Sequence, residues 1–222
     1  MANPHFDPNT TPTGVYKPGR KRDENLQRIL DAAEEEFVQR GYRGATIQAI
    51  ADRAGLPKAN IHYYFKSKAN LYTSVLNNLL DLWNTQFSQI QPDDDPAVAL
   101  DRFIREKVRI SYTQPRASKL FAMEVIAGAP YLGSYLQTDI RQWVNDRAKV
   151  IQSWVDQGLM KTSDPVQLIF LIWSSTQHYA DFETQVLTIM DQLTYDEATI
   201  EHISSFLSQT ILTGCGLTPP VT

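Results

Sequence analysis

A run of polar and aromatic side chains between positions 58 and 65 has residue types and spacing that suit chemistry. In this segment, KANIHYYF, Ile61 and Phe65 lie four positions apart and on a helix should face the core. The remaining functional side chains would then face outward: Lys58, Asn60, His62, Tyr63 and Tyr64. Asparagine can form two hydrogen bonds with adenine, while lysine, histidine and tyrosine can reach phosphates or base edges. The segment therefore predicts a helix that reads a DNA groove.

Two further lysines extend this set toward the DNA backbone. Lys66 and Lys68 flank the start of the next helix, where unpaired backbone N–H groups already favour a phosphate. An alternative stays open for the aromatic residues, because Tyr63 or Tyr64 can instead pack against the preceding helix.

A second set of candidate residues lies near the C-terminal end. Trp173, Gln177 and Asp181 are spaced four apart, so on a helix they share one stripe within an otherwise apolar segment. A buried amide and a buried carboxylate need partners, and a tryptophan offers a flat stacking surface. The stripe predicts a small-molecule site, although Trp173 could be core and Asp181 could pair with an arginine. His178 points away from the stripe, which favours an interhelical or interface role.

The elements that must position the first set are three helices. Apolar residues at helical spacing begin after Asp23 and end at Gly41, which is placed as a C-cap. Thr46 is placed to cap a short helix that Gly55 closes, and residues 58–64 form another after a tight turn. Two short helices joined by a glycine-containing turn predict a helix-turn-helix.

The rest of the chain also has helical patterns. Ser67 should cap a long helix to about Ser88, and helices of the C-terminal end should span 165 to about 190 and 196–212. Asp164 and Pro165 suit the start of the first of these, and Thr194 with Glu197 has capping-box spacing before the second. We predict an all-α fold of about nine helices. The chain should consist of a disordered basic tail (1–22), a helix-turn-helix domain (23–68) and a larger helical ligand-binding and dimerisation domain (69–222).

Charge and composition narrow the function classes. The net charge is −4, yet residues 1–70 carry eleven Lys and Arg against eight Asp and Glu, while the remainder carries ten against seventeen. The basic end suits phosphate contact. A single cysteine, Cys215, excludes an internal disulfide, and no Cys/His spacing predicts a metal or cofactor. No apolar run can span a membrane and no signal-peptide pattern is present, so a cytoplasmic location is expected.

The N-terminal motifs resemble the TetR family of bacterial regulators. The resemblance covers residues 29–72 and includes Ala32-Ala33, Phe37, Gly41-Tyr42, Thr46, Ile50-Ala51, Ala54-Gly55, Tyr63-Tyr64-Phe65, Lys68 and Leu71. It implies that Lys58, Asn60, His62 and Tyr63 belong to the recognition helix, and that Thr46, Tyr64 and Lys68 contact the DNA backbone. Pro57 departs from the family pattern, because many members have a serine N-cap there.

The C-terminal motifs are similar to the RutR-like pyrimidine-utilisation regulators within that family. They are ASKLF at 117–121 through Glu124, GAP at 128–130, and IWSSTQHYADF at 172–182. The resemblance implies release from DNA by uracil or thymine, with Trp83, Trp173 and Gln177 as contacts. A glutamine amide matches the alternating N–H and C=O edge of a pyrimidine dione.

Reading two DNA half-sites requires a two-fold dimer, for which the last two helices are the expected interface. We expect a repressor of pyrimidine or nitrogen catabolism genes that binds a palindromic operator. In this protein, a ligand bound between the fourth and eighth helices is expected to shift the fourth helix. Three alternatives stay open: a TetR-type regulator with an unrelated effector, a helical enzyme acting on a pyrimidine, and an adaptor that binds only protein. The enzyme is disfavoured because no nucleophile elbow, phosphate loop or dinucleotide motif occurs.

Overall fold

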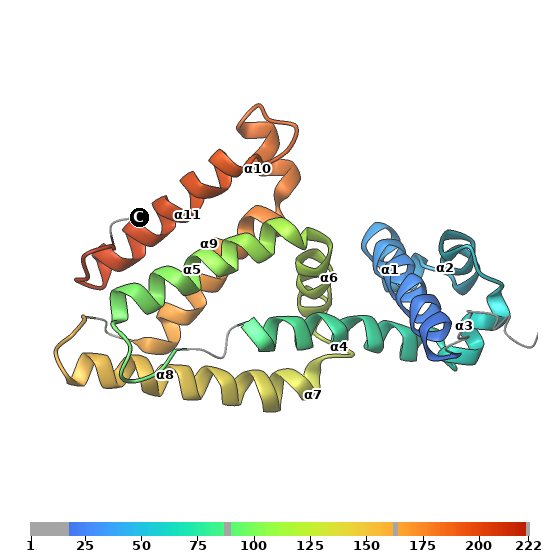
Figure 1. The fold of residues 1–222 in the computed structure, drawn as a ribbon, viewed down its shortest axis with the longest axis horizontal. Helices are drawn as coiled ribbons and strands as arrows, with labels where there is room; N and C mark the ends of the chain where they lie inside the picture. Colours follow the sequence, from blue (N-terminus) through green and yellow to red (C-terminus); the bar gives the residue numbers. More distant parts are fainter. Residues whose placement is uncertain (1–17, 87–89, 162–163, 221–222) are drawn as a thin grey trace, which may run out of the picture.

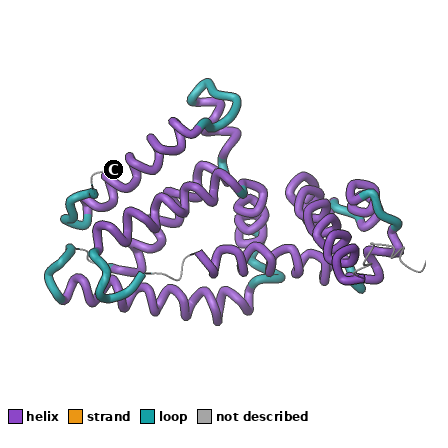
Figure 2. Tube along the Cα trace, viewed as in Figure 1, coloured by secondary structure: helices purple, strands orange, loops and turns teal. Residues whose placement is uncertain are grey.

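The computed structural model describes residues 18–86, 90–161 and 164–220, and these ranges contain helices and loops but no strand (Figure 2). A small head consists of α1 (Pro18–Gly44), α2 (Ile47–Ala54) and α3 (Lys58–Tyr64), and α4 (Lys68–Gln86) runs from it into a larger body (Figure 1). The body contains α5 (Pro96–Thr113), α6 (Pro115–Ile126), α7 (Gly133–Tyr135), a π-helix (Leu136–Ile140), α8 (Arg141–Asp156), α9 (Pro165–Asp181), α10 (Glu183–Ile189) and α11 (Glu197–Gly214). The prediction of an all-α fold with an N-terminal helix-turn-helix is confirmed.

The apolar core of the described residues extends into the head. Phe37 of α1, Ile50 of α2 and Ile61 of α3 are fully buried and belong to one cluster. Burial of each such side chain contributes about 1.5–3 kcal/mol. The core joins the head to α4, because Leu71 and Val75 of α4 are buried in the same cluster.

The first helix begins earlier than its apolar pattern indicated. It starts at Pro18 rather than Asp23, so the segment 1–22 is not wholly a tail, and residues 1–17 lie outside the described part of the chain. Proline suits a first helical turn and lysine and arginine are good helix formers, which explains the extension. Gly41 adopts a left-handed φ of 65° as expected of a C-cap, but a further turn continues to Gly44.

The C-terminal end of the chain differs from prediction at two places. The helix predicted from Pro165 to about residue 190 is divided at Phe182 into α9 and α10. Tyr195 explains the break, because its hydroxyl donates a hydrogen bond of 2.9 Å to the carbonyl of Tyr179, in the last turn of α9. The final helix is capped by Asp196, which accepts from the Thr199 amide at 2.7 Å, rather than by a box that begins at Thr194.

Other predicted helix ends are confirmed. Ser67 accepts a hydrogen bond from the Asn70 amide at 3.1 Å at the start of α4, and Asp164 caps α9 with Pro165 in its first turn. Cys215 is buried at the end of α11. Within the described ranges, the helices are all too short or too polar to cross a bilayer, and His, Cys, Asp and Glu side chains do not gather into a group able to hold a metal ion.

Candidate functional site

The outward face of α3 carries most of the predicted DNA-reading residues. Lys58 and His62 are exposed, Asn60 is partly exposed, and the Tyr63 side chain is 75% exposed. Ile61 is buried beneath them, as its spacing predicted. The helix therefore presents hydrogen-bonding side chains to solvent on a small, rigid support.

The turn before α3 fixes the direction of this face. Gly55 ends α2 with a left-handed φ of 62°, and its N–H donates to the carbonyls of Ala51 and Asp52. Arg28 of α1 donates to the carbonyl of Ala54 at 2.6 Å, which ties the turn to the first helix. Pro57 stands at the N-cap of α3 without a side-chain hydrogen bond, as its departure from the family pattern implied.

The three residues predicted to contact the DNA backbone differ in their surroundings. Thr46 is exposed and caps α2 by accepting from the Ala49 amide at 3.1 Å. Tyr64 is half-buried, and its hydroxyl donates to a backbone carbonyl of α1 at 3.3 Å. Lys68 donates to the carbonyls of Tyr42 and Ala45 at 2.8 and 2.9 Å, so in this structure its ammonium closes the end of α1.

Three acidic residues of α1 form ion pairs away from α3. Glu35 and Glu36 of α1 form ion pairs with Arg53 of α2. Glu34 pairs with Arg116 of α6 at 3.4 Å. These ion pairs place negative charge where α1 packs against α2 and α6. The exposed face of α3, by contrast, carries no acidic side chain. The exposed surface of α3 therefore suits an anionic partner.

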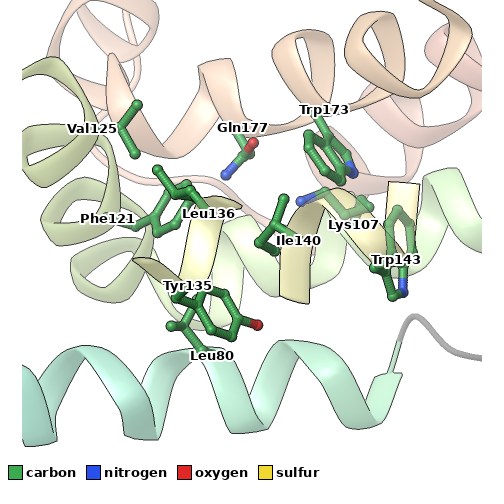
Figure 3. A pocket seen from close by; sticks show the side chains of 10 residues that line it. All are labelled: Leu80, Lys107, Phe121, Val125, Tyr135, Leu136, Ile140, Trp143, Trp173 and Gln177. Atoms are coloured by element: carbon green, nitrogen blue, oxygen red, sulfur yellow. The ribbon is translucent and has the colours of Figure 1, made fainter. Parts of the chain in front are cut away.

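A cavity of about 230 Å³ lies in the body where α4, α5, α6, the π-helix, α8 and α9 meet. Ten side chains line it: Leu80, Lys107, Phe121, Val125, Tyr135, Leu136, Ile140, Trp143, Trp173 and Gln177 (Figure 3). The volume is below the ~300–1,000 Å³ typical of pockets for drug-sized molecules, which favours a small ligand. Short π-helical segments often occur at functional sites.

The structure brings two of the four predicted ligand residues to this cavity. Trp173 and Gln177 both line it, one turn apart on α9. The Trp173 ring stacks on Trp143 of α8, with centroids 5.6 Å apart and planes 29° apart. Among the residues that the structure describes, none forms a hydrogen bond with the Gln177 amide, which leaves its donor and acceptor for a ligand. Trp83 belongs to α4, but its side chain lies outside the described part of the structure.

Asp181 does not line the cavity, although its spacing grouped it with Trp173 and Gln177. It lies at the end of α9 and accepts a hydrogen bond of 2.6 Å from the Ser118 hydroxyl of α6. Burial raises the pKa of Asp181, while this hydrogen bond and the charges of Lys107 and Lys119 act in the opposite direction. The carboxylate thus joins α9 to α6. His178 is exposed and stacks on Phe182, with ring centroids 5.1 Å apart.

Lys107 of α5 is a charged residue of the cavity that sequence reasoning missed. Its side chain is buried, and burial lowers the pKa of Lys107 to about 7 against the opposing charge of Asp181. Its signal was present in the sequence, because Lys107 follows Leu100 and Ile104 at helical spacing on the apolar stripe of α5. A lysine on the buried face of a helix indicates a special role, because burying an ammonium is costly.

Comparisons with known proteins identify the family of the chain. A family model described as "Bacterial regulatory proteins, tetR family" matches residues 29–75, and one described as "YcdC-like protein, C-terminal region" matches residues 76–218. The chain belongs to the TetR family. The resemblance found in the N-terminal motifs is therefore confirmed.

Individual relatives refine this assignment. The regulator is 39% identical over 188 residues to the HTH-type transcriptional regulator RutR of Escherichia coli (strain K12), which covers 82% of this chain and 88% of RutR. It is 26% identical over 161 residues to the HTH-type transcriptional repressor KstR2 of Rhodococcus jostii (strain RHA1), covering 69% and 74% of the two chains. The RutR-like resemblance is confirmed, and the protein is a DNA-binding transcriptional regulator.

Solved structures share its fold. The transcriptional regulator SCO4942 from Streptomyces coelicolor superposes with a TM-score of 0.69 at 21% identity, covering 87% of this chain and 99% of that one. AibR in complex with isovaleryl coenzyme A and operator DNA gives 0.67 at 19% identity, covering 89% and 100%.

In this TetR-family regulator, a buried carboxylate of the body contacts α4, the helix that runs into the head. Glu124 of α6 accepts a hydrogen bond from the Tyr72 hydroxyl of α4 at 3.0 Å and from the amides of Tyr131 and Leu132 at 2.6 and 3.1 Å. Burial and the neighbouring Glu124 raise the pKa of Tyr72. Because Phe121 and Val125 of the same helix line the cavity, α6 touches both the candidate ligand site and the helix that enters the head.

Proposed function

We propose that this regulator is a repressor of pyrimidine or nitrogen catabolism genes that leaves its operator when uracil, thymine or a similar planar pyrimidine fills the cavity. The observation that carries the proposal is the Gln177 amide, which faces the cavity beside Trp173 without a described hydrogen-bond partner. One amide offers a donor and an acceptor, which match an adjacent N–H and C=O on a pyrimidine dione. The similarity to RutR supports the same class of effector.

On the DNA side, the exposed residues of α3 are proposed to read the major groove. Asn60 is assigned a base contact, with Lys58, His62 and Tyr63 contacting bases or phosphates around it. Thr46, Tyr64 and Lys68 are assigned to the DNA backbone. Thr46 can act as it stands, whereas Lys68 would need to exchange its carbonyl partners for a phosphate.

A palindromic operator requires two copies of this surface, ~34–36 Å apart. The proposed interface of the homodimer is the face formed by α9 and α11. The two helices expose large apolar side chains, Phe170 and Leu171 of α9 and Phe206 of α11. A groove between the helices is lined by Leu171 of α9 and by Leu207 and Ile211 of α11. Packing these helices against a second copy would form a four-helix bundle.

The effector would act through the helices that line its cavity. Leu80 lies on α4, which runs directly into the head, and α6 reaches α4 through Glu124 and α1 through Arg116. A ligand that favours one position of these helices changes the separation of the two α3 surfaces. Its effect is limited by its preference between the two conformations, typically ~1–3 kcal/mol.

Calorimetric titration of the purified protein tests the effector. Uracil and thymine should bind, and in a gel shift with DNA that flanks the gene they should release the regulator. Gln177→Ala should abolish pyrimidine binding but leave folding and operator binding intact. Gln152→Ala is the matched control, because Gln152 is exposed on α8 and lies outside the cavity.

A regulator with an unrelated small effector is the second candidate, and the largely apolar lining of the cavity favours it. In that case the wild-type protein would bind no pyrimidine, while a member of a wider metabolite panel would release it from DNA. Turnover of a pyrimidine by the purified protein would instead revive the enzyme alternative.

A further inference from the structure

We infer that the hydrogen bond between Tyr72 and Glu124 is a latch between the head and the body, which holds the two parts in one arrangement and opens when they move relative to each other. Glu124 is then a positioning residue for operator binding, because it sets the orientation of the head from inside the body. The inference rests on the proposed function, which requires two arrangements of these parts, and it adds the contact that distinguishes them.

Tyr72 is packed into the head. Its ring lies edge-on to that of Phe37 of α1, with centroids 4.8 Å apart, and its centroid is 5.0 Å from that of Tyr42. Phe37 and Tyr72 are both buried. Lys68, one turn earlier on α4, donates to the Tyr42 carbonyl and lies 4.6 Å from the centre of the same ring. These contacts fix the Tyr72 hydroxyl relative to the helices that carry the DNA-reading surface.

Glu124 is fixed within the body by the loop before α7. One carboxylate oxygen accepts from the amides of Tyr131 and Leu132 at 2.6 and 3.1 Å, and the other accepts from the Tyr72 hydroxyl at 3.0 Å. The Tyr131 ring also contacts that of Tyr72, with centroids 5.1 Å apart, but ring contacts tolerate separations of ~4.5–7 Å. Because Glu124 is buried, a hydroxyl that moves away leaves a buried oxygen without its hydrogen bond, which is costly.

The walls of the cavity reach Glu124 from two sides. Phe121 and Val125 flank it on α6 and line the cavity, and the loop that donates to it leads into α7 and the lining residue Tyr135. The helix α6 stands beside α4 close to the head (Figure 1). A molecule that displaces either wall therefore displaces the carboxylate, whereas Tyr72 stays with α1. Because a hydrogen bond is confined to a narrow range of distance and angle, a small displacement opens the latch.

A second contact between α6 and the head differs from the latch. Arg116 at the start of α6 pairs with Glu34 and Glu35 of α1 at 3.4 and 3.6 Å, and its side chain is 53% exposed. Water can replace either partner of this ion pair, so its loss costs little. The Tyr72–Glu124 bond is buried on both sides, and burial together with Glu124 raises the pKa of Tyr72, so the phenol keeps the proton with which it donates. The buried contact therefore distinguishes two arrangements more sharply than the exposed one.

Removal of the latch should produce a gain of affinity. Uracil and the operator are proposed to favour different arrangements of head and body, and the latch stabilises one of them. Tyr72→Phe removes the hydroxyl but keeps the ring contacts, so it releases that arrangement without disturbing the head. The ligand that prefers the other arrangement should then bind more tightly, because less free energy is needed to populate it. A hydrogen bond that only stabilises the fold would produce no such gain.

Titration of the full-length wild-type, Tyr72→Phe and Tyr195→Phe proteins with uracil and with operator DNA tests the latch. We expect Tyr72→Phe to bind one of these ligands at least about three-fold more tightly than the wild type, and the other no more tightly. Tyr195→Phe is the matched control, because Tyr195 is also buried and its hydroxyl donates at 2.9 Å to the Tyr179 carbonyl inside the body. This variant should gain affinity for neither ligand. Thermal unfolding should find both variants folded, since phenylalanine keeps the aromatic ring.

Four results would overturn the inference, and they separate it from the proposed function. If uracil releases the wild-type protein from the operator but Tyr72→Phe gains affinity for neither ligand, the latch is wrong and the proposed function stands. If Tyr195→Phe shows the same gain as Tyr72→Phe, the gain reflects a general loosening of the fold. A Tyr72→Phe protein that fails to fold would also contradict the latch, because a bond that opens cannot be required for folding. If uracil does not release the wild-type protein, the proposed function fails and the inference fails with it.

Discussion

Asn60 and Lys58 are two positions apart on α3 yet should contribute to operator binding in different ways. Asn60→Ala removes a side chain assigned to a base, so we expect a loss of ~1–3 kcal/mol in affinity for the operator and little change on unrelated DNA. Lys58→Ala removes a charge assigned to phosphate. This substitution should weaken binding to all DNA sequences. It should also reduce by about one the number of counterions released on binding, which is measured as the slope of log affinity against log salt concentration.

Fluorescence anisotropy with operator and scrambled DNA at several salt concentrations distinguishes these effects. Glu197→Gln is a suitable control, because Glu197 is exposed on α11 in the body. If Asn60→Ala weakened operator and scrambled DNA equally, Asn60 would not be a base-reading residue.

Lys107 should also affect the pH dependence of stability. Burial lowers the pKa of Lys107 to about 7 from 10.5, so between these values the unfolded chain binds more protons than the folded one. The contribution of Lys107 to the free energy of unfolding should therefore rise as the pH rises through this window. The cost of burying the charge is fully present below pH 7 and absent above 10.5.

Urea unfolding of the wild type and Lys107→Met at several pH values between about 7 and 10 measures this effect. The variant should be more stable than the wild type at pH 7, and the difference should shrink as the pH rises. A difference independent of pH would mean that Lys107 keeps an ordinary pKa in the folded protein. Lys119→Met should show no such gain in stability.

At the scale of elements, the turn between α2 and α3 determines where the recognition helix points. Gly55 adopts a left-handed φ of 62°, and a Cβ atom there would approach a guanidinium nitrogen of Arg28 to 3.0 Å. Gly55→Ala should lower the free energy of unfolding by ~1–2 kcal/mol, because a left-handed conformation is unfavourable for alanine. It should also weaken operator binding, since Arg28 ties this turn to α1.

The comparison for Gly55→Ala is Gly133→Ala in α7. A Cβ atom at Gly133 meets no atom within 4 Å, and the residue is helical, so this variant should be as stable as the wild type or more so. Chemical denaturation measures the free energy of unfolding of both variants. Equal stability of the two variants would show that the turn tolerates a side chain.

At the scale of the whole molecule, function depends on two copies held in one arrangement. Leu171→Glu places a charge on the exposed apolar face of α9, where we propose that the second copy packs. We expect a folded monomer whose operator affinity falls by about 10²–10⁴-fold, because the two half-sites are no longer bound together. Sedimentation analysis and gel shift measure the two effects.

Ile126→Glu controls for the introduction of a charge at an exposed apolar position. Ile126 is exposed on α6 and does not line the groove between α9 and α11, so this variant should stay dimeric. A Leu171→Glu protein that remains dimeric would place the interface elsewhere.

The sequence alone determined the head and the family. Local signals carry that information: the apolar spacing of α1, the Thr46 cap, the left-handed Gly55 and the paired Ile61 and Phe65 all depend on residues a few positions apart. Local propensity and hydrogen bonding suffice to place such elements. The same holds for Asp164 and Pro165 at the start of α9.

Only the tertiary structure decided which side chains share the cavity. Lys107, Trp143 and the π-helix reach it from segments far from Gln177 in sequence, and a helical period shows which face is buried but not what it faces. Asp181 illustrates the limit, because it shares a stripe with Gln177 and yet lies one turn too far and contacts Ser118. The break at Phe182 has the same origin: the hydroxyl of Tyr195 reaches the end of α9 only after the chain has folded back.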